Sequence, residues 1–437
     1  MRGPSLANSP YDPRRAELGA FRGAIVARDG SPLAVTHGGT RSYPLGGALG
    51  QVLGYLSPRY GTTGLEAAFD SDLRARRTAA DPARELGALF TRHGLPAIER
   101  GATVVTTIDP AVERALYGAL ARFPRAAGVA LDPRTGAVLA LASVPSFDPG
   151  RVAAEFPALR ANANAPLLDR ALDGLYPPGS TFKIFTAATA LADGVTTPDA
   201  TFEDPGFLQV GAATIHDDEG EVPGTQDLAG AFALSSNVDF ARLAIAIGPD
   251  RWLAAARAWD LGGPLRFELP VARDRLPTAA ELSPSVLAQL GFGQADLLVT
   301  PLRMATVAAT VAAGGTTPRP FLVSAIRRNG RDRSVGRPAA LASPISRDVA
   351  AQVAVLMRAV VERGTGTGAA LPGIAVAGKT GTATNPAGRS DAWFVAFAPA
   401  GAPRVAVAVV VENVGYGATY AVPAARGALA AALGDGS

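Results

Sequence analysis

The chain has 437 residues, a formal net charge of +3 and no cysteine. This length predicts two or three domains with a sizeable buried core. The near balance of charges, spread without blocks, argues against a nucleic-acid or membrane-surface binder. The absence of cysteine excludes disulfides, thiolate metal sites and cysteine nucleophiles. Its three histidines lie far apart in the sequence, and the acidic residues after His216 predict a solvated loop, so we expect neither a metal nor a cofactor.

Residues 1–100 are rich in Gly and Pro, with short apolar runs such as 23–27, and predict a small strand-rich or irregular domain. Helical pieces are expected at 72–77 and 82–89, ahead of a boundary near Gly101. We therefore divide the chain into an N-terminal domain, 1–100, and a second domain, 101–437.

The second domain has strands near both of its ends and helices between them. In chain order we predict a strand at 103–108, a helix from 110 to about 123, strands at 128–131 and 137–144, a helical centre at 180–315, a helix at 349–362, strands at 374–377, 392–398 and 404–411, and a closing helix at 422–433. This order predicts an α+β fold with one antiparallel sheet between helices.

Lysine is rare in this chain. Of the 41 basic residues only Lys183 and Lys379 are lysine, and the other 39 are arginine. Arginine suffices wherever only charge is needed, whereas the pKa of an amine can be shifted and that of a guanidinium cannot. The two lysines are therefore expected to handle protons.

Lys183 follows Ser180 in the segment Pro-Pro-Gly-Ser-Thr-Phe-Lys, where the prolines and glycine predict a helix that begins at Ser180. Serine and lysine at i and i+3 share one helix face. The free N–H groups and the dipole at the helix N-terminus favour an oxyanion, and a neutral amine nearby can accept the hydroxyl proton. Burial and a second cation, Lys379, would keep Lys183 neutral.

Lys379 opens a Lys-Thr-Gly-Thr segment after the predicted strand at 374–377. Strand alternation places Thr380 and Thr382 on one face, where two hydroxyls and an ammonium suit a carboxylate. Gly381 would allow another peptide to approach the strand closely.

A third segment, Ser235-Ser236-Asn237, interrupts a helical stretch from 227 to 247 and offers a hydroxyl and an amide. Each of the three motifs is common by itself, since Ser-x-x-Lys occurs on many surface helices and Lys-Thr-Gly in many turns. The chance that the only two lysines fall in these two contexts is on the order of 1 in 1,000 from residue frequencies. We therefore favour the functional interpretation.

Ser-x-x-Lys, Ser-x-Asn and Lys-Thr-Gly in this order resemble the penicillin-binding proteins and serine β-lactamases. The resemblance covers nearly the whole chain. It is closest to the class B penicillin-binding proteins, and among these to the actinobacterial-type penicillin-binding protein A subgroup. Further similar segments lie at 22–25, 60–66, 291–294 and 364–366. Thr384 and Asp391 depart from the residues common at these positions in the family, without touching the expected nucleophile.

This resemblance implies the penicillin-recognising serine transferase fold, a sheet between helices with a helical subdomain, and a non-catalytic, dimerisation-like pedestal formed by residues 1–100. It also implies a D,D-transpeptidase in which Ser180 forms an acyl-enzyme and Lys183 is the base. Ser235 and Lys379 would return a proton, and Asn237 would hold the substrate amide. Thr380, Gly381 and Thr382 would form a substrate-binding strand in which the two threonines bind the terminal carboxylate. The N–H groups of Ser180 and Thr382 would form the oxyanion hole.

The expected partners are peptidoglycan stem peptides ending in D-Ala-D-Ala, β-lactams and a separate membrane glycan polymerase. The resemblance also implies work at the extracytoplasmic face of the bacterial membrane and an N-terminal anchor, which we expect to be encoded upstream of Met1. A serine β-lactamase is disfavoured because the chain is long and has no Glu-x-x-Leu-Asn segment. A D,D-carboxypeptidase differs only in using water as the acceptor and stays open, as does a non-catalytic muropeptide-binding scaffold.

Overall fold

The computed structural model describes residues 21–77 and 98–434. The chain forms two compact units that interleave along the sequence. The first unit comprises Met1–Asp109, Ser146–Leu167 and Leu322–Arg337, and the second comprises the remaining segments. Two later segments therefore join the N-terminal unit, which a division at residue 100 does not anticipate. None of the helices in the described ranges is long and apolar enough to cross a membrane.

The first unit contains a six-stranded sheet in the order β17-β16-β8-β1-β2-β3. Strand β1 pairs in parallel with β8, and the later hairpin of β16 and β17 continues the sheet beyond β8. Its elements are β1 (Ile25–Val26), β2 (Pro32–His37), β3 (Thr40–Ser42), α2 (Gly50–Leu53), β4 (Leu56–Ser57), β5 (Gly61–Thr62), α3 (Gly64–Ala68), α4 (Asp70–Leu73), β6 (Arg76–Arg77), β7 (Ile98–Glu99), β8 (Thr103–Thr106), α7 (Val152–Ala161), β16 (Val323–Arg328) and β17 (Arg331–Ser334).

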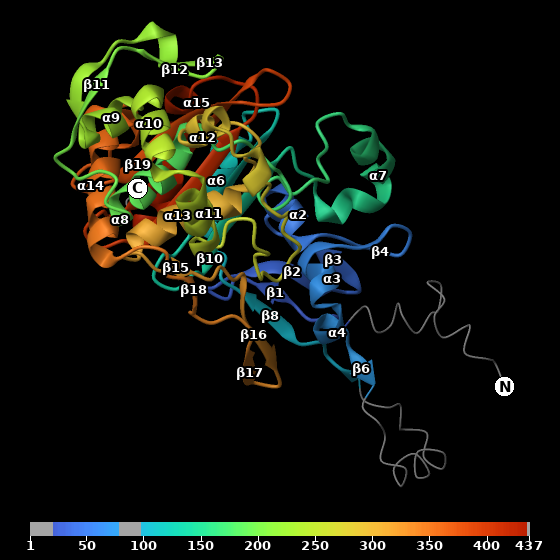
Figure 1. Cartoon of the computed structure of the whole chain (residues 1–437). Helices are drawn as coiled ribbons and strands as arrows, with labels where there is room; N and C mark the ends of the chain where they lie inside the picture. The colour runs from blue at the N-terminus through green and yellow to red at the C-terminus, as the bar shows by residue number, and fades with distance from the viewer. Residues whose placement is uncertain (1–20, 78–97, 435–437) are drawn as a thin grey trace, which may run out of the picture. The chain divides into compact units, whose positions relative to one another are not determined.

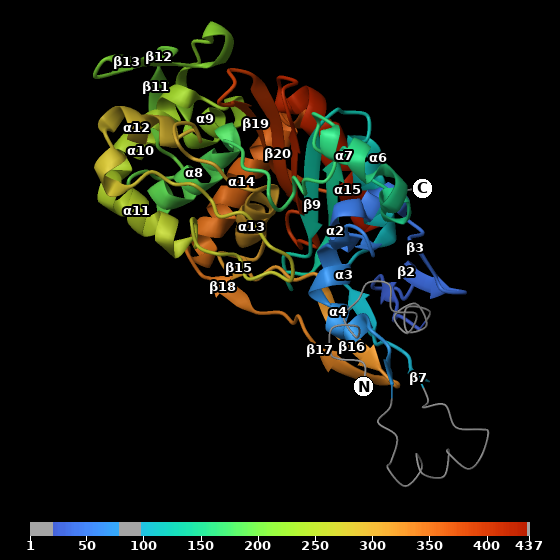
Figure 2. The same ribbon diagram turned by 90° about the vertical axis from the view of Figure 1, so that its right-hand side faces the viewer.

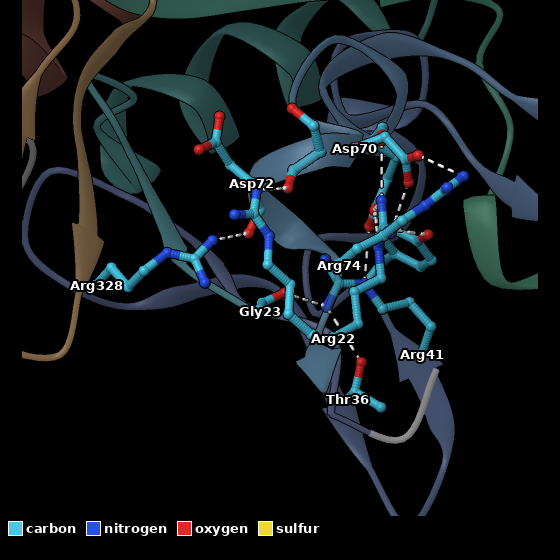
Figure 3. A network of polar contacts seen from close by, with 12 residues as sticks. Arg22, Gly23, Thr36, Arg41, Asp70, Asp72, Arg74 and Arg328 are labelled. Carbon is cyan, nitrogen blue, oxygen red and sulfur yellow. Dashed lines mark hydrogen bonds and ion pairs between the residues drawn. The ribbon is translucent and has the colours of Figure 1, made fainter. Parts of the chain in front are cut away.

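A buried polar network ties the start of this unit to α3 and α4 (Figure 3). Arg22 donates from Nε to Glu66 Oε2 at 2.7 Å and from Nη1 to Asp70 Oδ1 at 2.8 Å. Arg41 reaches the other oxygen of Glu66 at 2.7 Å and the carbonyl oxygen of Gly23. Glu66 is fully buried and is paired with both arginines, so either arginine alone still compensates its charge. Removal of both would leave a buried unpaired carboxylate, which costs about 3–5 kcal/mol in comparable buried pairs. Two of the family-like segments, at 22–25 and 60–66, therefore meet in the structure.

The second unit is built on a five-stranded antiparallel sheet in the order β10-β9-β21-β20-β19. Its strands are β9 (Ala126–Leu131), β10 (Val138–Val144), β19 (Ala377–Thr384), β20 (Ser390–Ala398) and β21 (Val405–Val411). Helices α6 (Pro110–Leu120) and α15 (Gly417–Leu433) cover one face, and α13 (Pro301–Ala312) packs on the other (Figure 2). Because both faces are covered, the strands are almost continuously apolar and buried.

The helical part of this unit lies beside strand β19 (Figure 1). It comprises α8 (Lys183–Ala192), α9 (Leu228–Leu234), α10 (Asn237–Ile247), α11 (Pro249–Ala258), α12 (Pro284–Leu290) and α14 (Arg347–Arg363). Two hairpins follow α8, formed by β11 (Thr201–Asp204) with β14 (Gly224–Asp227) and by β12 (Phe207–Val210) with β13 (Ala213–His216). A short strand pair, β15 (Thr317–Pro318) with β18 (Ala340–Ala342), completes the unit.

The predicted α+β architecture is confirmed, while several local predictions are wrong. The segment 201–227 forms hairpins within a region predicted as helical. The helix predicted at 72–77 ends with α4 at Leu73, and Arg76–Arg77 is a strand. The strand predicted at 374–377 begins instead at Ala377 and carries the Lys-Thr-Gly motif within it. The closing helix begins at Gly417, five residues before the predicted start. The helix predicted at 82–89 lies outside the described residues.

Candidate active site

Ser180 lies in a single 3₁₀ turn, η3 (Gly179–Phe182), and α8 begins at Lys183, three residues later than predicted. The two prolines before the turn prevent a helix from extending through them. Trp393 Nε1 donates to the carbonyl oxygen of Pro177 at 3.0 Å and so fixes the position of this segment. The N–H of Lys183 still bonds to the carbonyl oxygen of Ser180, so serine and lysine share one turn.

Two glycines allow η3 to lie directly against strand β19. Gly179 has a φ of +54°, and a Cβ there would come within 2.7 Å of the carbonyl oxygen of Thr382. A Cβ on Gly381 would come within 2.9 Å of the Thr181 methyl group and 3.1 Å of the Thr181 nitrogen. The close approach predicted at Gly381 is therefore made by this chain's own η3, which brings Ser180 beside Thr382.

The Ser235-Ser236-Asn237 segment is a tight turn between α9 and α10, as predicted. Ser235 ends α9 with φ 69° and ψ 37°, a left-handed conformation that is uncommon for a non-glycine residue. Ser236 caps α10 by accepting from the N–H of Asp239 at 2.9 Å. The turn thus separates the two helices and presents Ser235 and Asn237 toward α8.

The three motifs meet in one hydrogen-bond network around Ser235. Lys379 Nζ donates to Ser235 Oγ at 2.8 Å, and Lys183 Nζ lies 3.2 Å from the same oxygen. Lys183 Nζ also donates to Asn237 Oδ1 at 2.8 Å and to the carbonyl oxygen of Ser235. Ser180 is mostly buried and both lysines are fully buried.

Burial controls the protonation of both amines. It lowers the pKa of Lys183 to about 7, against the opposing effect of Asp218 and other nearby carboxylates. Burial also lowers the pKa of Lys379 well below its usual value, and the charge of Lys183 lowers it further. The rings of Phe240 and Phe232, each 5.6 Å from one amine, form part of the apolar surroundings. At neutral pH a large fraction of Lys183 is therefore uncharged and able to accept a proton.

Thr380 and Thr382 follow Lys379 on β19. Thr380 is buried and its hydroxyl is hydrogen-bonded to the hydroxyl of Thr365, which lies in the loop after α14. Thr365 belongs to the family-like segment 364–366, for which the sequence indicated no role. The hydroxyl next to Lys379 on the strand is thus held by a residue outside the three motifs.

Sequence reasoning missed the contribution of the acidic segment after His216. Its expected solvated character is wrong for Asp217, which is 5% exposed and accepts from the N–H of Asn237 at 2.5 Å. Asp218 is exposed and accepts from Asn237 Nδ2 at 3.2 Å. An acidic run in a sequence does not reveal that Asp217 is buried while its neighbour Asp218 is exposed. Within the described ranges, no group of three or more acidic or histidine side chains is placed to hold a metal ion.

Asp391, one of the two departures from the family pattern, has a structural place. It is buried in β20, where its carboxylate accepts from Asn385 Nδ2 at 3.0 Å and from the N–H of Asn413 at 2.9 Å. Burial raises the pKa of Asp391, and these hydrogen bonds act in the opposite direction. Its carboxylate therefore ties two loops together at the end of the sheet.

Two family models match the chain. The penicillin-binding protein transpeptidase domain matches residues 126–430, and the penicillin-binding protein A dimerisation domain matches residues 22–93. The first match covers well over half of the chain and includes all three motifs.

Individual relatives agree with these matches. The chain is 38% identical over 422 residues to the peptidoglycan D,D-transpeptidase PbpA of Mycobacterium tuberculosis, covering 90% of this chain and 82% of that protein. It is 37% identical to the protein of the same name from Mycolicibacterium smegmatis, covering 91% and 85%.

Solved structures agree as well. The ceftriaxone acyl-enzyme complex of penicillin-binding protein A from M. tuberculosis is similar with a TM-score of 0.86 at 34% identity, covering 96% of this chain and 100% of that one. A D,D-transpeptidase domain from Eggerthella lenta is similar with a TM-score of 0.84 at 35% identity, covering 95% and 98%. The predicted resemblance to the penicillin-binding protein A subgroup is confirmed, and the chain belongs to the penicillin-binding protein transpeptidase family.

Proposed function

We propose that this protein is a peptidoglycan D,D-transpeptidase that cross-links stem peptides through an acyl-enzyme on Ser180 and is acylated there by β-lactams. One observation carries the proposal: the two lysines of the chain, from different motifs, both contact the hydroxyl of Ser235 in a buried site beside the turn of Ser180. The names of the relatives, peptidoglycan D,D-transpeptidases, and the acyl-enzyme complexes of M. tuberculosis penicillin-binding protein A support it.

In the first step Ser180 Oγ attacks the carbonyl carbon between the two terminal D-alanines, and neutral Lys183 accepts the hydroxyl proton. The lowered pKa of Lys183, about 7, suits this role near neutral pH. Negative charge develops on the carbonyl oxygen, which the N–H groups of Ser180 and Thr382 would stabilise. The contact of Gly179 with Thr382 supports this pairing, because it brings the two backbone segments together.

In the second half of this step the C–N bond breaks and D-alanine leaves. Its nitrogen takes a proton through Ser235, whose hydroxyl is bonded to Lys379 on one side and lies near Lys183 on the other. Asn237 fixes Lys183 through Oδ1 and would also bind the substrate amide. Thr380 and Thr382, with Gly381 between them, would bind the terminal carboxylate beside Lys379. An amine of a neighbouring stem then attacks the acyl-enzyme, forms the new amide and releases Ser180.

Labelling with a fluorescent penicillin tests the assignment of the nucleophile. The wild-type protein should form a covalent adduct that persists in denaturant, and Ser180→Ala should abolish it. Ser346→Ala, which changes a serine that caps α14 outside the three motifs, is a control and should still be labelled. Undiminished labelling of Ser180→Ala would overturn the assignment.

The acceptor distinguishes a transpeptidase from a D,D-carboxypeptidase. With a stem pentapeptide and an added acceptor amine, we expect release of D-alanine together with a cross-linked product. Release of D-alanine with only the hydrolysed tetrapeptide would support the carboxypeptidase instead, and no release despite penicillin labelling would support a binding scaffold.

The proposal extends to the setting of the enzyme. A peptidoglycan transpeptidase works on the cell wall outside the cytoplasm, and the resemblance to class B proteins supports a place at the outer face of the membrane beside a separate glycan polymerase. The match of residues 22–93 to a dimerisation domain supports a non-catalytic, pedestal-like role for the N-terminal domain, 1–100.

A further inference from the structure

We propose that Asp217 and Asp204, two buried carboxyl groups from the hairpins that follow α8, are positioning residues that hold the Ser235-Ser236-Asn237 turn in its active geometry. The inference rests on the function proposed above and deepens it, because it assigns the orientation of Ser235 and Asn237 to side chains outside all three motifs.

Asp217 holds the backbone of the turn. Its Oδ1 accepts from the N–H of Asn237 at 2.5 Å and from the N–H of Val238 at 3.2 Å. These are two of the N–H groups that helix α10 leaves without a partner in its own first turn. A carboxylate at this helix N-terminus also interacts favourably with the helix dipole. The cap of α10 is thus divided between its own Ser236 and a residue some twenty positions earlier in the chain.

Asp204 holds the remaining side chain of the turn. Ser236 Oγ donates to Asp204 Oδ2 at 2.6 Å while it accepts from the N–H of Asp239. Asp204 and Ser236 are both almost completely buried, so this contact is shielded from water. Asp217 thus holds the backbone N–H of Asn237 and Asp204 holds the hydroxyl of Ser236, so the turn is fixed at two points.

The same segment sets the orientation of the Asn237 amide. Asn237 Nδ2 donates to the carbonyl oxygen of His216 at 3.1 Å and to Asp218 Oδ1 at 3.2 Å. Both partners can only accept, so they must face the NH₂ group. Asn237 Oδ1 is thereby directed toward Lys183 Nζ, 2.8 Å away. The residues around Asp217 therefore determine which end of the amide meets the catalytic amine.

The two carboxyl groups also interact with each other. The pKa of Asp217 is raised to about 6, first by burial and next by a side-chain hydrogen bond with Asp204. Asp217 Oδ2 has no donor among the described residues, and a proton shared with Asp204 would satisfy it. Asp217 thus serves the turn with Oδ1, which leaves Oδ2 for the bond with Asp204. The second oxygen of Asp204, Oδ1, accepts from the N–H of Gly206 at 2.8 Å.

The test separates positioning from folding. The variants are Asp217→Ala, which removes the oxygen that accepts from both N–H groups, and Asp217→Asn, whose side-chain oxygen can still accept from them. Ser346→Ala is a matched control because Ser346 caps α14 in the same way, through a bond to Val349, without contact to the three motifs. For each variant, stopped-flow labelling with a fluorescent penicillin gives the maximal acylation rate and the dissociation constant of the non-covalent complex, and circular dichroism gives the melting temperature.

We expect Asp217→Ala to lower the maximal acylation rate about tenfold or more, because small displacements of catalytic groups have effects of this size. The dissociation constant should change less than this rate, and Asp217→Asn should restore most of the rate. Ser346→Ala should acylate like the wild type even if its melting temperature falls.

A folded Asp217→Ala variant with the wild-type rate would overturn the proposal, as would equal losses in Asp217→Ala and Ser346→Ala. If Asp217→Ala does not fold, Asp204→Ala and Asp204→Asn decide, because the alanine removes the acceptor of Ser236 Oγ and the asparagine keeps an acceptor oxygen. Asp204→Ala should lower the acylation rate and Asp204→Asn should restore most of it, so a folded Asp204→Ala variant with the wild-type rate would contradict the proposal. Labelling that survives Ser180→Ala would instead overturn the proposed function, which keeps the two failures distinct.

Discussion

Replacement of Lys183 by methionine should make the stability of the protein less dependent on pH. The folded protein holds Lys183 with a pKa of about 7, whereas an unfolded chain has the ordinary lysine value near 10.5. Between these values the unfolded state binds more protons than the folded state, so the free energy of unfolding of the wild type rises with pH. The penalty of burying the charge is complete below the folded pKa and disappears as the pH approaches 10.5. A methionine has no such penalty at any pH.

The size of the effect follows from the displaced pKa. A tenfold change in the protonation equilibrium corresponds to about 1.4 kcal/mol. Integration over pH for a group with a folded pKa of about 7 gives about 2 kcal/mol between pH 7 and pH 9. The wild type should gain this free energy of unfolding between pH 7 and pH 9, and Lys183→Met should not. The difference in stability between the two proteins should therefore grow by about 2 kcal/mol over this interval. The oxygen atoms of Ser235 and Asn237 that lose their donor cost about 1–3 kcal/mol each, but this cost does not vary with pH.

Urea denaturation at several values between pH 7 and pH 9 measures the difference directly. Ser180→Ala is the control, since it also disables the proposed nucleophile but removes no titrating group, and its difference from the wild type should be constant. A constant difference for Lys183→Met over the same range would refute the lowered pKa and the neutral-base mechanism with it.

Three further predictions concern the catalytic groups. Lys183→Arg should abolish acylation by fluorescent penicillin because a guanidinium cannot act as the base, while Lys379→Arg should weaken it less; equal losses would contradict the division of roles between the two amines. The acylation rate of the wild type should rise with pH through about 7, since only neutral Lys183 accepts the proton of Ser180, and a rate that falls over this interval in stopped-flow measurements would exclude it as the base. Gly381→Ala should slow acylation and lower the melting temperature by the cost of a Cβ placed 2.9 Å from Thr181, and an unchanged rate would show that η3 can move away from β19 without consequence.

More of the candidate site than of the surrounding fold could be predicted from the sequence. Lys183 and Lys379 stand out against arginine because their chemistry needs a movable pKa, and each sits in a motif whose spacing is local. The convergence on Ser235 could be inferred only from the family resemblance, since 144 residues separate Ser235 from Lys379. The absence of a side chain at Gly381 indicated room for another peptide, but the sequence could not show that η3 of the same chain lies against this glycine.

The parts that escaped prediction depend on contacts between distant residues. The hairpins at 201–227 are short, polar and partly exposed, so they carry no strong period-2 pattern. Asp217 lies in an acidic run that is typical of a solvated loop, and its burial becomes visible only when α10 is placed against it. The six-stranded sheet of the first unit likewise joins β8 with β16, more than 200 residues apart, which no local pattern indicates.

The complete burial of both lysines has a practical consequence for chemical modification. Lys183 and Lys379 carry the only amine side chains of this sequence, because the remaining basic side chains are guanidinium or imidazole groups. Succinimidyl esters applied to the folded protein should therefore leave every lysine side chain unmodified. Unfolding would expose both amines, so the dye incorporated at lysine would count unfolded molecules.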